Sequence, residues 1–333
     1  MKRFLSLLAL YSIPFLLAWG IYMAFDPFKV IWHYDNFLPT GEYATTLDMD
    51  YVSTTNYGHL NPQQHYNAFI FGNSRSRCWK VDSWRQHLDG DAVCYHFDAH
   101  GETLLGIDRK VGYIDRMGER LDHVLMVIDA SVLRETEIVR THIRYLAPQL
   151  ADWPDAVGFH VCNFKSFYTP RFTKAYLDFK LSGHVKPYMI ENEIFTRNDH
   201  YDPISNEYLP LTSEQKIATG TFYDGERMKM FEGQQFPDSV SPPLIAAKQL
   251  EMLEHMAGVF ARHHTDVKIA ISPLFNQIRL NPSDLVKLRE IFGADKVFDF
   301  SGVNDITSDF HHYYEESHYR IHIADSLFNV IYQ

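Results

Sequence analysis

Five short apolar stretches, each followed at once by small or polar residues, dominate the pattern of the chain. They cover residues 68–71, 92–97, 123–128, 267–271 and 296–300. Near-continuous apolar runs of this length are typical of strands buried on both faces of a sheet. Apolar residues at helical spacing lie between or after these runs, at 81–88, 102–121, 244–263, 282–292 and 319–332. The alternation predicts a three-layer α/β/α fold with a five-stranded parallel sheet of flavodoxin-like order.

The regular alternation is interrupted between the third and fourth strands. Residues 132–243 form a long, aromatic-rich insertion in which 173–181 is the clearest helical pattern. Long insertions of this kind are usually functional elaborations or lids, and the aromatic side chains could fill a core or stack on sugar rings. We expect an irregular connecting segment at 27–65 and an α/β domain at 66–333 that carries this insertion.

The first 26 residues predict a membrane anchor. After Lys2 and Arg3, the 22 residues from Phe4 to Phe25 carry no charge. A helix of that length reaches about 33 Å, enough to cross a hydrocarbon core of about 30 Å. A cleaved signal peptide and a buried soluble helix are the alternatives, but the bulky end of the stretch around Trp19 does not suit a cleavage site. The positive-inside rule then places the N-terminus in the cytoplasm and the rest of the chain outside it.

The amino-acid composition of the chain argues against some classes of function. The chain has 333 residues, with 31 Lys and Arg against 42 Asp and Glu, a formal net charge of −11. This acidic balance argues against a nucleic-acid-binding protein. Three cysteines are too few for a disulfide framework, and the sequence leaves open whether Cys78 and Cys94 pair. We expect no cofactor.

The strongest local signal for chemistry follows the first strand, where residues 69–76 read FIFGNSRS. This places Ser74 at the carboxyl end of a buried strand, where ligands bind in parallel α/β sheets. A nucleophilic serine needs that exposure and a nearby base. The alternative is a turn in which the serine caps the following helix, and Ser76 is a second candidate nucleophile.

A second signal lies between the fifth strand and the last helix. Glu315 and His318 are three residues apart, so on a loop or a first helical turn they can point the same way. A carboxylate that accepts a hydrogen bond from one imidazole nitrogen leaves the other nitrogen free to take a serine proton. The alternative is a surface pair that caps the helix. Together with His322 the pair could also ligate zinc, but no HExxH pattern is present, and we expect no metal site.

Taken together, these segments resemble the SGNH/GDSL hydrolase superfamily. Residues 72–74 resemble its Gly-Asp-Ser block, and residues 315–318 resemble its Asp-x-x-His block with Glu for Asp. The resemblance implies that Ser74 is the nucleophile, that His318 and Glu315 are the base and its orienting acid, and that Gly101 donates to the oxyanion. It also assigns Asn73 and Arg75 to substrate binding, although Arg75 could instead form a salt bridge. The Gly-x-Asn-Asp block is not matched, since residues 127–131 read VIDAS.

A narrower resemblance concerns membrane-anchored SGNH-like proteins of bacterial envelope and exopolysaccharide systems. It is carried by the N-terminal anchor, the Gly-Asn-Ser-Arg block and the tail that reads YYEESHYR over residues 313–320. It implies a serine acyl-ester hydrolase or O-acyltransferase on the periplasmic or outer face of the bacterial inner membrane. The implied partners are cell-surface glycan, an acyl donor and a multi-span membrane acyltransferase. A catalytically decayed scaffold and a general lipase or esterase are the alternatives.

Overall fold

The five predicted strands form one parallel sheet in the computed structural model, which describes residues 1–234, 236 and 238–333. The strands run in the spatial order β11-β9-β4-β2-β3. Numbered along the chain, this is the flavodoxin-like order 2-1-3-4-5 that the sequence predicts. The strands are β2 (Ala68–Asn73), β3 (Cys94–Ala99), β4 (His123–Ile128), β9 (Asp266–Ile271) and β11 (Val297–Asp299).

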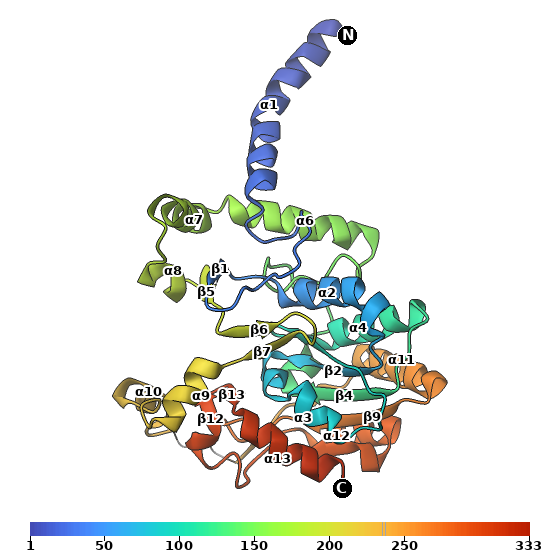
Figure 1. Ribbon diagram of the computed structural model, residues 1–333. Helices are drawn as coiled ribbons and strands as arrows, with labels where there is room; N and C mark the ends of the chain where they lie inside the picture. Colours follow the sequence, from blue (N-terminus) through green and yellow to red (C-terminus); the bar gives the residue numbers. More distant parts are fainter. Residues whose placement is uncertain (235, 237) are drawn as a thin grey trace.

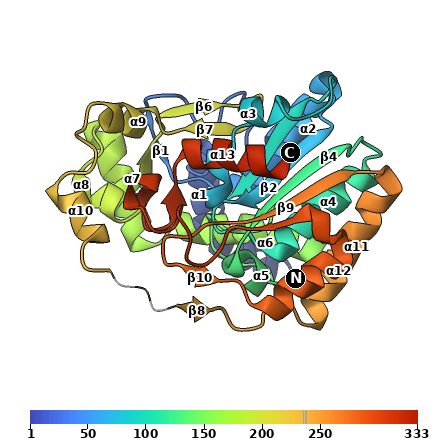
Figure 2. The same cartoon turned by 90° about the horizontal axis from the view of Figure 1, so that it is seen from below.

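The sheet lies between helices (Figure 1, Figure 2), and side chains of its central strands alternate between two cores, one on each face. Phe69 and Phe71 face one core, whereas Ala68 and Ile70 face the opposite core. The first core is covered by α2 (Met49–Gln64), α4 (Leu104–Arg116), α11 (Ala247–His263) and α12 (Pro282–Phe292). The second core is covered by α3 (Val81–Arg85) and α13 (Ile321–Ile331). Helices therefore cover both faces.

Helix α2 corrects the expectation that residues 27–65 are irregular. Its N-terminus is capped by Asp48, whose side chain accepts a hydrogen bond from the Asp50 backbone N–H. The helix buries polar residues such as Ser53, Thr54 and Asn56 beside Val52. A buried face made of polar side chains carries no apolar periodicity, so the hydrophobic pattern could not reveal this helix. The same segment also holds the short strand β1 (Tyr43–Thr45).

The insertion forms its own aromatic core against the end of the N-terminal segment. Phe159, Phe167, Phe172 and Tyr176 are buried there together with Phe28, so these rings fill a core. The insertion consists of α6 (Trp153–Phe167), α7 (Pro170–Ser182), α8 (Pro187–Glu191), β5 (Phe195–Arg197), β6 (His200–Asp202), β7 (Glu207–Leu209), α9 (Leu211–Ala218), α10 (Gly225–Phe231) and β8 (Ser239–Val240).

Short elements complete the carboxyl edge of the sheet. Apart from η2 (Ala294–Lys296), which leads directly into the start of β11, they are η1 (Ser74–Cys78), α5 (Ala130–Arg134), β10 (Ile278–Arg279), η3 (Phe310–His312), β12 (Tyr313–Glu315) and β13 (His318–Tyr319). The last two pair as an antiparallel hairpin, with Glu315 opposite His318. The predicted loop or helical turn at 315–318 is therefore a hairpin turn.

Helix α1 (Lys2–Phe25) projects from the insertion side of the molecule, with the N-terminus at its far end (Figure 1). The stretch Arg3–Phe25 is long and apolar enough to cross a membrane. The structure is thus a mixed α/β domain joined to one such helix at its N-terminus.

Candidate active site

Ser74 lies at the point where β2 ends and the tight η1 turn begins. A Cβ atom on Gly72 would lie 2.7 Å from both the Ser76 Cβ and the Val127 carbonyl oxygen, closer than such atoms approach. Glycine at this position lets η1 fold back against the strand end. The Asn73 side-chain oxygen then accepts a hydrogen bond of 2.9 Å from the Arg75 backbone N–H and fixes the turn. The half-buried Ser74 side chain is thereby held at the carboxyl edge of the sheet.

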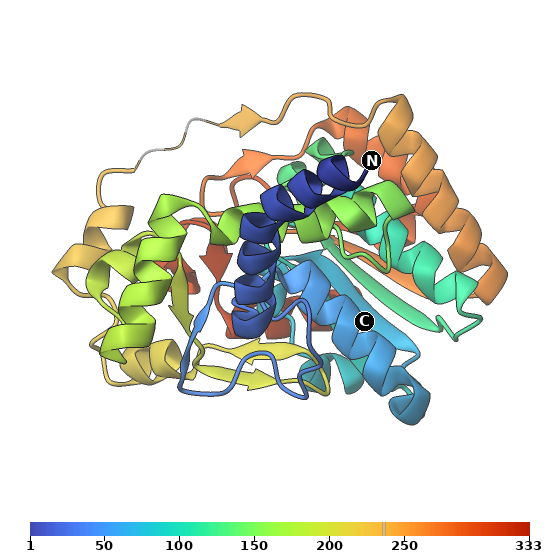
Figure 3. The same ribbon diagram turned by 90° about the horizontal axis from the view of Figure 1, so that it is seen from above.

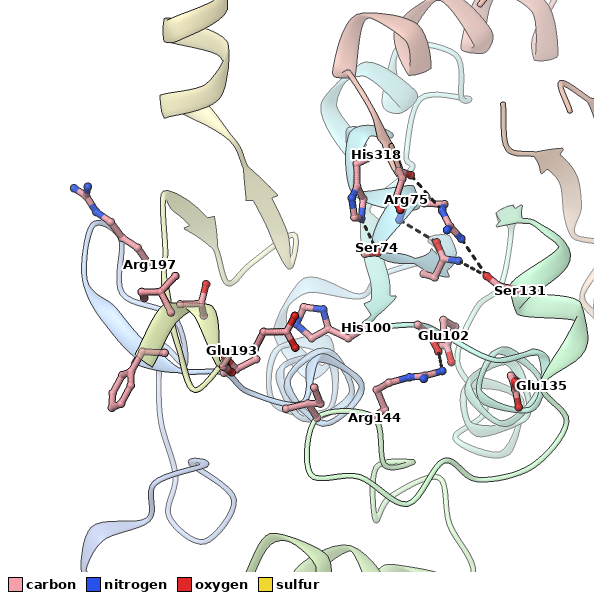
Figure 4. Close-up of a pocket in the computed structure, with 18 of the residues that line it drawn as sticks. Ser74, Arg75, His100, Glu102, Ser131, Glu135, Arg144, Glu193, Arg197 and His318 are labelled. Carbon is pink, nitrogen blue, oxygen red and sulfur yellow. Dashed lines mark hydrogen bonds between the residues drawn. The ribbon is translucent and has the colours of Figure 1, made fainter. Parts of the chain in front are cut away.

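The hairpin β12–β13 brings a base and a carboxylate to this serine from the other end of the chain, and Figure 4 shows the base, His318, beside Ser74. The His318 Nε2 atom lies 2.8 Å from the Ser74 Oγ atom. The other ring nitrogen, Nδ1, is hydrogen-bonded to Glu315. The second oxygen of Glu315 accepts a 3.0 Å hydrogen bond from the Ser317 backbone N–H. The three residues that the sequence assigns to chemistry thus form one hydrogen-bonded series.

Local electrostatics keep the carboxylate of this series ionised. Burial raises the pKa of Glu315, but the hydrogen bond and charge of His318 and the backbone N–H of Ser317 outweigh it, so the net pKa is lowered. An ionised Glu315 favours the tautomer with hydrogen on Nδ1, and Nε2 is then an acceptor directed at the serine hydroxyl. This is the protonation state a general base requires.

Asn73 and Arg75, which the sequence assigns to substrate binding, direct their side chains to a buried carboxylate. The Arg75 guanidinium lies 2.8 Å from Asp129 and 3.0 Å from the Ser131 hydroxyl, and its Nε donates to the Ser317 carbonyl at 3.2 Å. Asn73 donates to Asp129 at 2.8 Å. Burial raises the pKa of Asp129, but Arg75, Ser131 and Asn73 outweigh it and the net pKa is lowered. Both side chains therefore brace the loops around Ser74.

A cavity of about 820 Å³ opens beside Ser74, between the carboxyl edge of the sheet and the insertion (Figure 4). Ser74, His100, Gly101 and His318 border it from the sheet side. The insertion side is formed by Ile190, Glu193, Phe195, Thr196 and Arg197. A cavity of this volume is in the range of small-molecule binding sites.

Gly101 borders the cavity in a left-handed backbone conformation, with a φ of +57°. The Arg144 side chain packs over it, and a Cβ atom at Gly101 would lie 2.7 Å from the Arg144 Nε atom. Arg144 also donates a 3.0 Å hydrogen bond to the Gly101 carbonyl. Partial burial and the positive charge of Arg77 lower the pKa of the adjacent His100 to about 3. A neutral imidazole and a fixed glycine therefore lie on this wall.

A smaller cavity of about 310 Å³ lies on the other side of the same serine–histidine pair. Ser74, Arg75 and His318 border both cavities. The second is also lined by Arg77 of η1, by Tyr208, Pro210, Ser213 and Arg227 of the insertion, and by Tyr314 of the hairpin. The reactive pair can thus be approached by groups from two directions.

The remaining candidates lie apart from this chemistry. Ser76 is fully buried, with its hydroxyl 2.8 Å from the Asn73 carbonyl and 2.8 Å from the His96 Nε2 atom. Cys78 and Cys94 are free thiols. Across the described part of the chain, no group of three or more His, Cys, Asp or Glu side chains is arranged to hold a metal ion.

Sequence reasoning missed the roles of Asp129, Ser131 and Arg144. Asp129 and Ser131 follow the third strand, so their position at a strand end was an available signal. Arg144 lies in the insertion and gives no local signal. Comparison with protein-family models, curated proteins and solved structures finds no match for the chain.

Proposed function

We propose that the protein is a membrane-anchored, extracytoplasmic serine acyl-ester hydrolase or O-acyltransferase of SGNH type. Its proposed substrate is an acylated glycan of the bacterial cell surface. One observation carries the proposal: the 2.8 Å contact between Ser74 Oγ and His318 Nε2, with Nδ1 bonded to Glu315, at the edge of a large cavity. Serine and histidine are 244 residues apart in sequence, so this contact is a product of the fold.

In the first half of the proposed reaction, the Ser74 oxygen attacks the carbonyl carbon of an acyl ester while His318 Nε2 takes the serine proton. The tetrahedral intermediate collapses when the imidazolium returns that proton to the leaving alcohol oxygen. The C–O bond to the alcohol breaks, and the acyl group remains on Ser74. Glu315 stabilises the imidazolium through its bond to Nδ1 and does not itself take the proton.

In the second half, a hydroxyl group approaches the acyl-serine and His318 removes its proton. Attack on the acyl carbon forms the new ester, or a free acid when the hydroxyl belongs to water. The bond between the acyl carbon and the Ser74 oxygen breaks, and His318 returns the proton to that oxygen. The two cavities that share the serine–histidine pair offer separate places for the donor and the acceptor. This arrangement favours transfer between two bound molecules over simple hydrolysis.

The oxyanion of the intermediate needs hydrogen-bond donors, each of which is worth about 10²–10³ in rate. We assign this role to the backbone N–H groups of Ser74 and Gly101, both of which border the cavity. The family's third block supplies an asparagine donor, whereas the corresponding strand end here carries Asp129 and Ser131. Asp129 is committed to Arg75 and Asn73. The proposed oxyanion hole therefore uses backbone donors.

The charged lining of the cavity favours a glycan over a lipid as the substrate. Charged groups line much of it, including Arg134, Glu135, Arg144, Glu193 and Arg197. Sugars offer many hydroxyl groups to such a surface, whereas an acyl chain needs an apolar wall. The flavodoxin-like sheet order and the strand-end positions of Ser74 and Gly101 support the SGNH-type assignment. A multi-span membrane acyltransferase is the proposed source of acyl groups.

The test compares wild type with Ser74→Ala for esterase activity on an acetylated sugar and for acetylation of surface glycan in a deletion strain. We expect the variant to lose at least about 10³-fold of the activity, because the nucleophile is absent. Unchanged activity in Ser74→Ala contradicts the proposal. If both proteins are inactive but bind glycan equally, the scaffold interpretation replaces it.

A further inference from the structure

Helix α6 presents an apolar face to its surroundings. Over residues 153–164, all of them described, the exposed side chains are Trp153, Pro154, Val157 and Val161. Trp153 is 78% exposed. The outward face of a helix on a water-soluble surface usually carries charged residues, so this face is suited to a different environment.

The same face of α6 continues into the contact with the anchor helix. Phe164 and Tyr168 extend the row of Trp153, Val157 and Val161 along one side of the helix. The Phe164 ring lies 5.3 Å from the Trp19 ring and 5.9 Å from the Phe15 ring of α1, measured between centroids. The Tyr168 hydroxyl donates to the Ala18 carbonyl at 2.6 Å. The exposed part of the row is therefore continuous with a surface that already covers α1.

The position of this contact along α1 indicates how deep in a bilayer the contact would lie. Phe15 precedes the end of the apolar stretch at Phe25 by ten residues, a rise of about 15 Å. A bilayer that covers the whole stretch from Arg3 to Phe25 would bring lipid to the level of α6. Figure 1 shows α1 leaving the molecule directly at α6, and Figure 3 shows α6 and α7 lying across the face from which α1 projects.

Helix α7 adds basic and apolar groups to this face of the molecule. Leu177 and Leu181 are exposed on one side of α7, with Lys174 beside them. The Tyr176 ring of α7 also contacts Phe25, at 5.8 Å. Residues 165–186 contain five Lys and Arg and one Asp, whereas the chain as a whole has a net charge of −11. Leucine with flanking lysine is typical of helices that lie in a bilayer interface rich in anionic lipid.

We propose that α6 and α7 form a membrane-surface platform that inserts Trp153, Val157, Val161, Leu177 and Leu181 into the outer leaflet beside α1. Lysines of α7 face the headgroups of anionic phospholipids. The platform holds the domain in one orientation on the bilayer, which a single anchor helix cannot do. It requires that α1 crosses the membrane, but it does not depend on the chemistry at Ser74.

The test uses the full chain in phosphatidylcholine–phosphatidylglycerol vesicles that contain lipids brominated on their acyl chains, which quench nearby tryptophan fluorescence. We expect Trp153→Phe to remove a quenched component from the wild-type signal. A variant with Trp153→Phe and Val286→Trp keeps the number of tryptophans but moves one to exposed α12, and we expect its added tryptophan to be unquenched. Trp19→Phe reports separately on α1.

One outcome overturns the insertion of the platform into lipid, and a second overturns the proposed role of its lysines. Quenching of Trp19 without quenching of Trp153 shows that the anchor inserts while α6 stays out of the lipid, as it would if α6 were a docking site for another protein. Equal Trp153 quenching in vesicles with and without phosphatidylglycerol removes the role of the lysines. We expect Lys174→Glu with Lys180→Glu to reduce the quenching, and the same change at exposed Lys216 and Lys229 to leave it unaltered.

Discussion

The position of Ser74 depends on Gly72, two residues before it, because glycine has no side chain. Gly72 lies within the sheet, where the Val127 carbonyl and the Ser76 side chain leave no room for a Cβ atom. Asn73 then fixes the turn through the Arg75 backbone, while Asp129 holds the side chains of Asn73 and Arg75. The Ser74 side chain is thus positioned by its neighbours before its contact with His318 is considered.

Gly72→Ala should destabilise the fold by about 1–3 kcal/mol, because the added methyl group forces the backbone of β2 away from β4. The matched control is Gly58→Ala in α2, where the new Cβ would lie 3.7 Å from the Tyr113 hydroxyl, an ordinary contact. Alanine is the better helix former, so Gly58→Ala should be neutral or slightly stabilising. Thermal unfolding in detergent micelles measures both. Equal melting temperatures for the two variants would contradict this account of Gly72.

At the residue scale, the sequence predicts the candidate site residues that lie next to the ends of strands. Ser74, Gly101 and His318 follow or precede recognisable strands and helices, and the parallel topology brings such positions to one edge. The strand-end position of Asp129 places it at the same edge of the sheet, but the sequence does not predict its pairing with Asn73 and Arg75, because more than fifty residues separate it from both.

At the scale of elements, the candidate site is a junction of three short pieces: η1, the start of α5 and the hairpin β12–β13. Arg75 joins all three through Asp129, Ser131 and the Ser317 carbonyl. The sequence predicts a loop or helical turn where the hairpin lies, since a three-residue spacing between Glu315 and His318 fits several local structures. Helix α2 could not be predicted for a different reason: its buried face carries polar side chains, so the sequence shows no apolar periodicity there.

Arg75→Lys should weaken the site without unfolding the protein. Lysine keeps a charge near Asp129, but it lacks the planar fork that also reaches the Ser317 carbonyl. We expect the rate at which an uncharged fluorophosphonate labels Ser74 to fall about ten- to a hundredfold, with little change in melting temperature. Arg85→Lys, at an exposed position on α3, should have no effect. A normal labelling rate with a raised KM for glycan would instead assign Arg75 to substrate binding.

At the scale of the molecule, three apolar assemblies are stacked: the covered sheet, the aromatic core of the insertion and the apolar N-terminal helix α1. The pattern of strands and helices predicted the first, and the charge-free N-terminal stretch predicted the last. The insertion core could not be predicted in detail, because its aromatic residues come from two separate parts of the chain, the N-terminal segment and the insertion, and meet only after folding.

Acid should destabilise the whole fold through a buried histidine. Burial lowers the pKa of His96 to about 3, against the opposing charge of Asp98. Below pH 6.5 the unfolded chain therefore binds a proton that the folded chain excludes, and stability is lost as the pH falls toward 3. We expect His96→Gln to reduce the slope of unfolding free energy against pH by up to about 1.4 kcal/mol per pH unit. Exposed His184→Gln should leave the slope unchanged, and an equal slope in both variants contradicts this assignment.

Covalent labelling of the full chain with a fluorophosphonate, followed by mass spectrometry of the peptides, tests the central claim most directly. A serine activated by His318 and Glu315 should carry one adduct, on Ser74, and this adduct should be lost in Ser74→Ala and strongly reduced in His318→Ala. Ser76→Ala should retain it, because Ser76 is buried and faces His96. The absence of an adduct on wild-type Ser74, or labelling that survives unchanged in His318→Ala, would contradict the account.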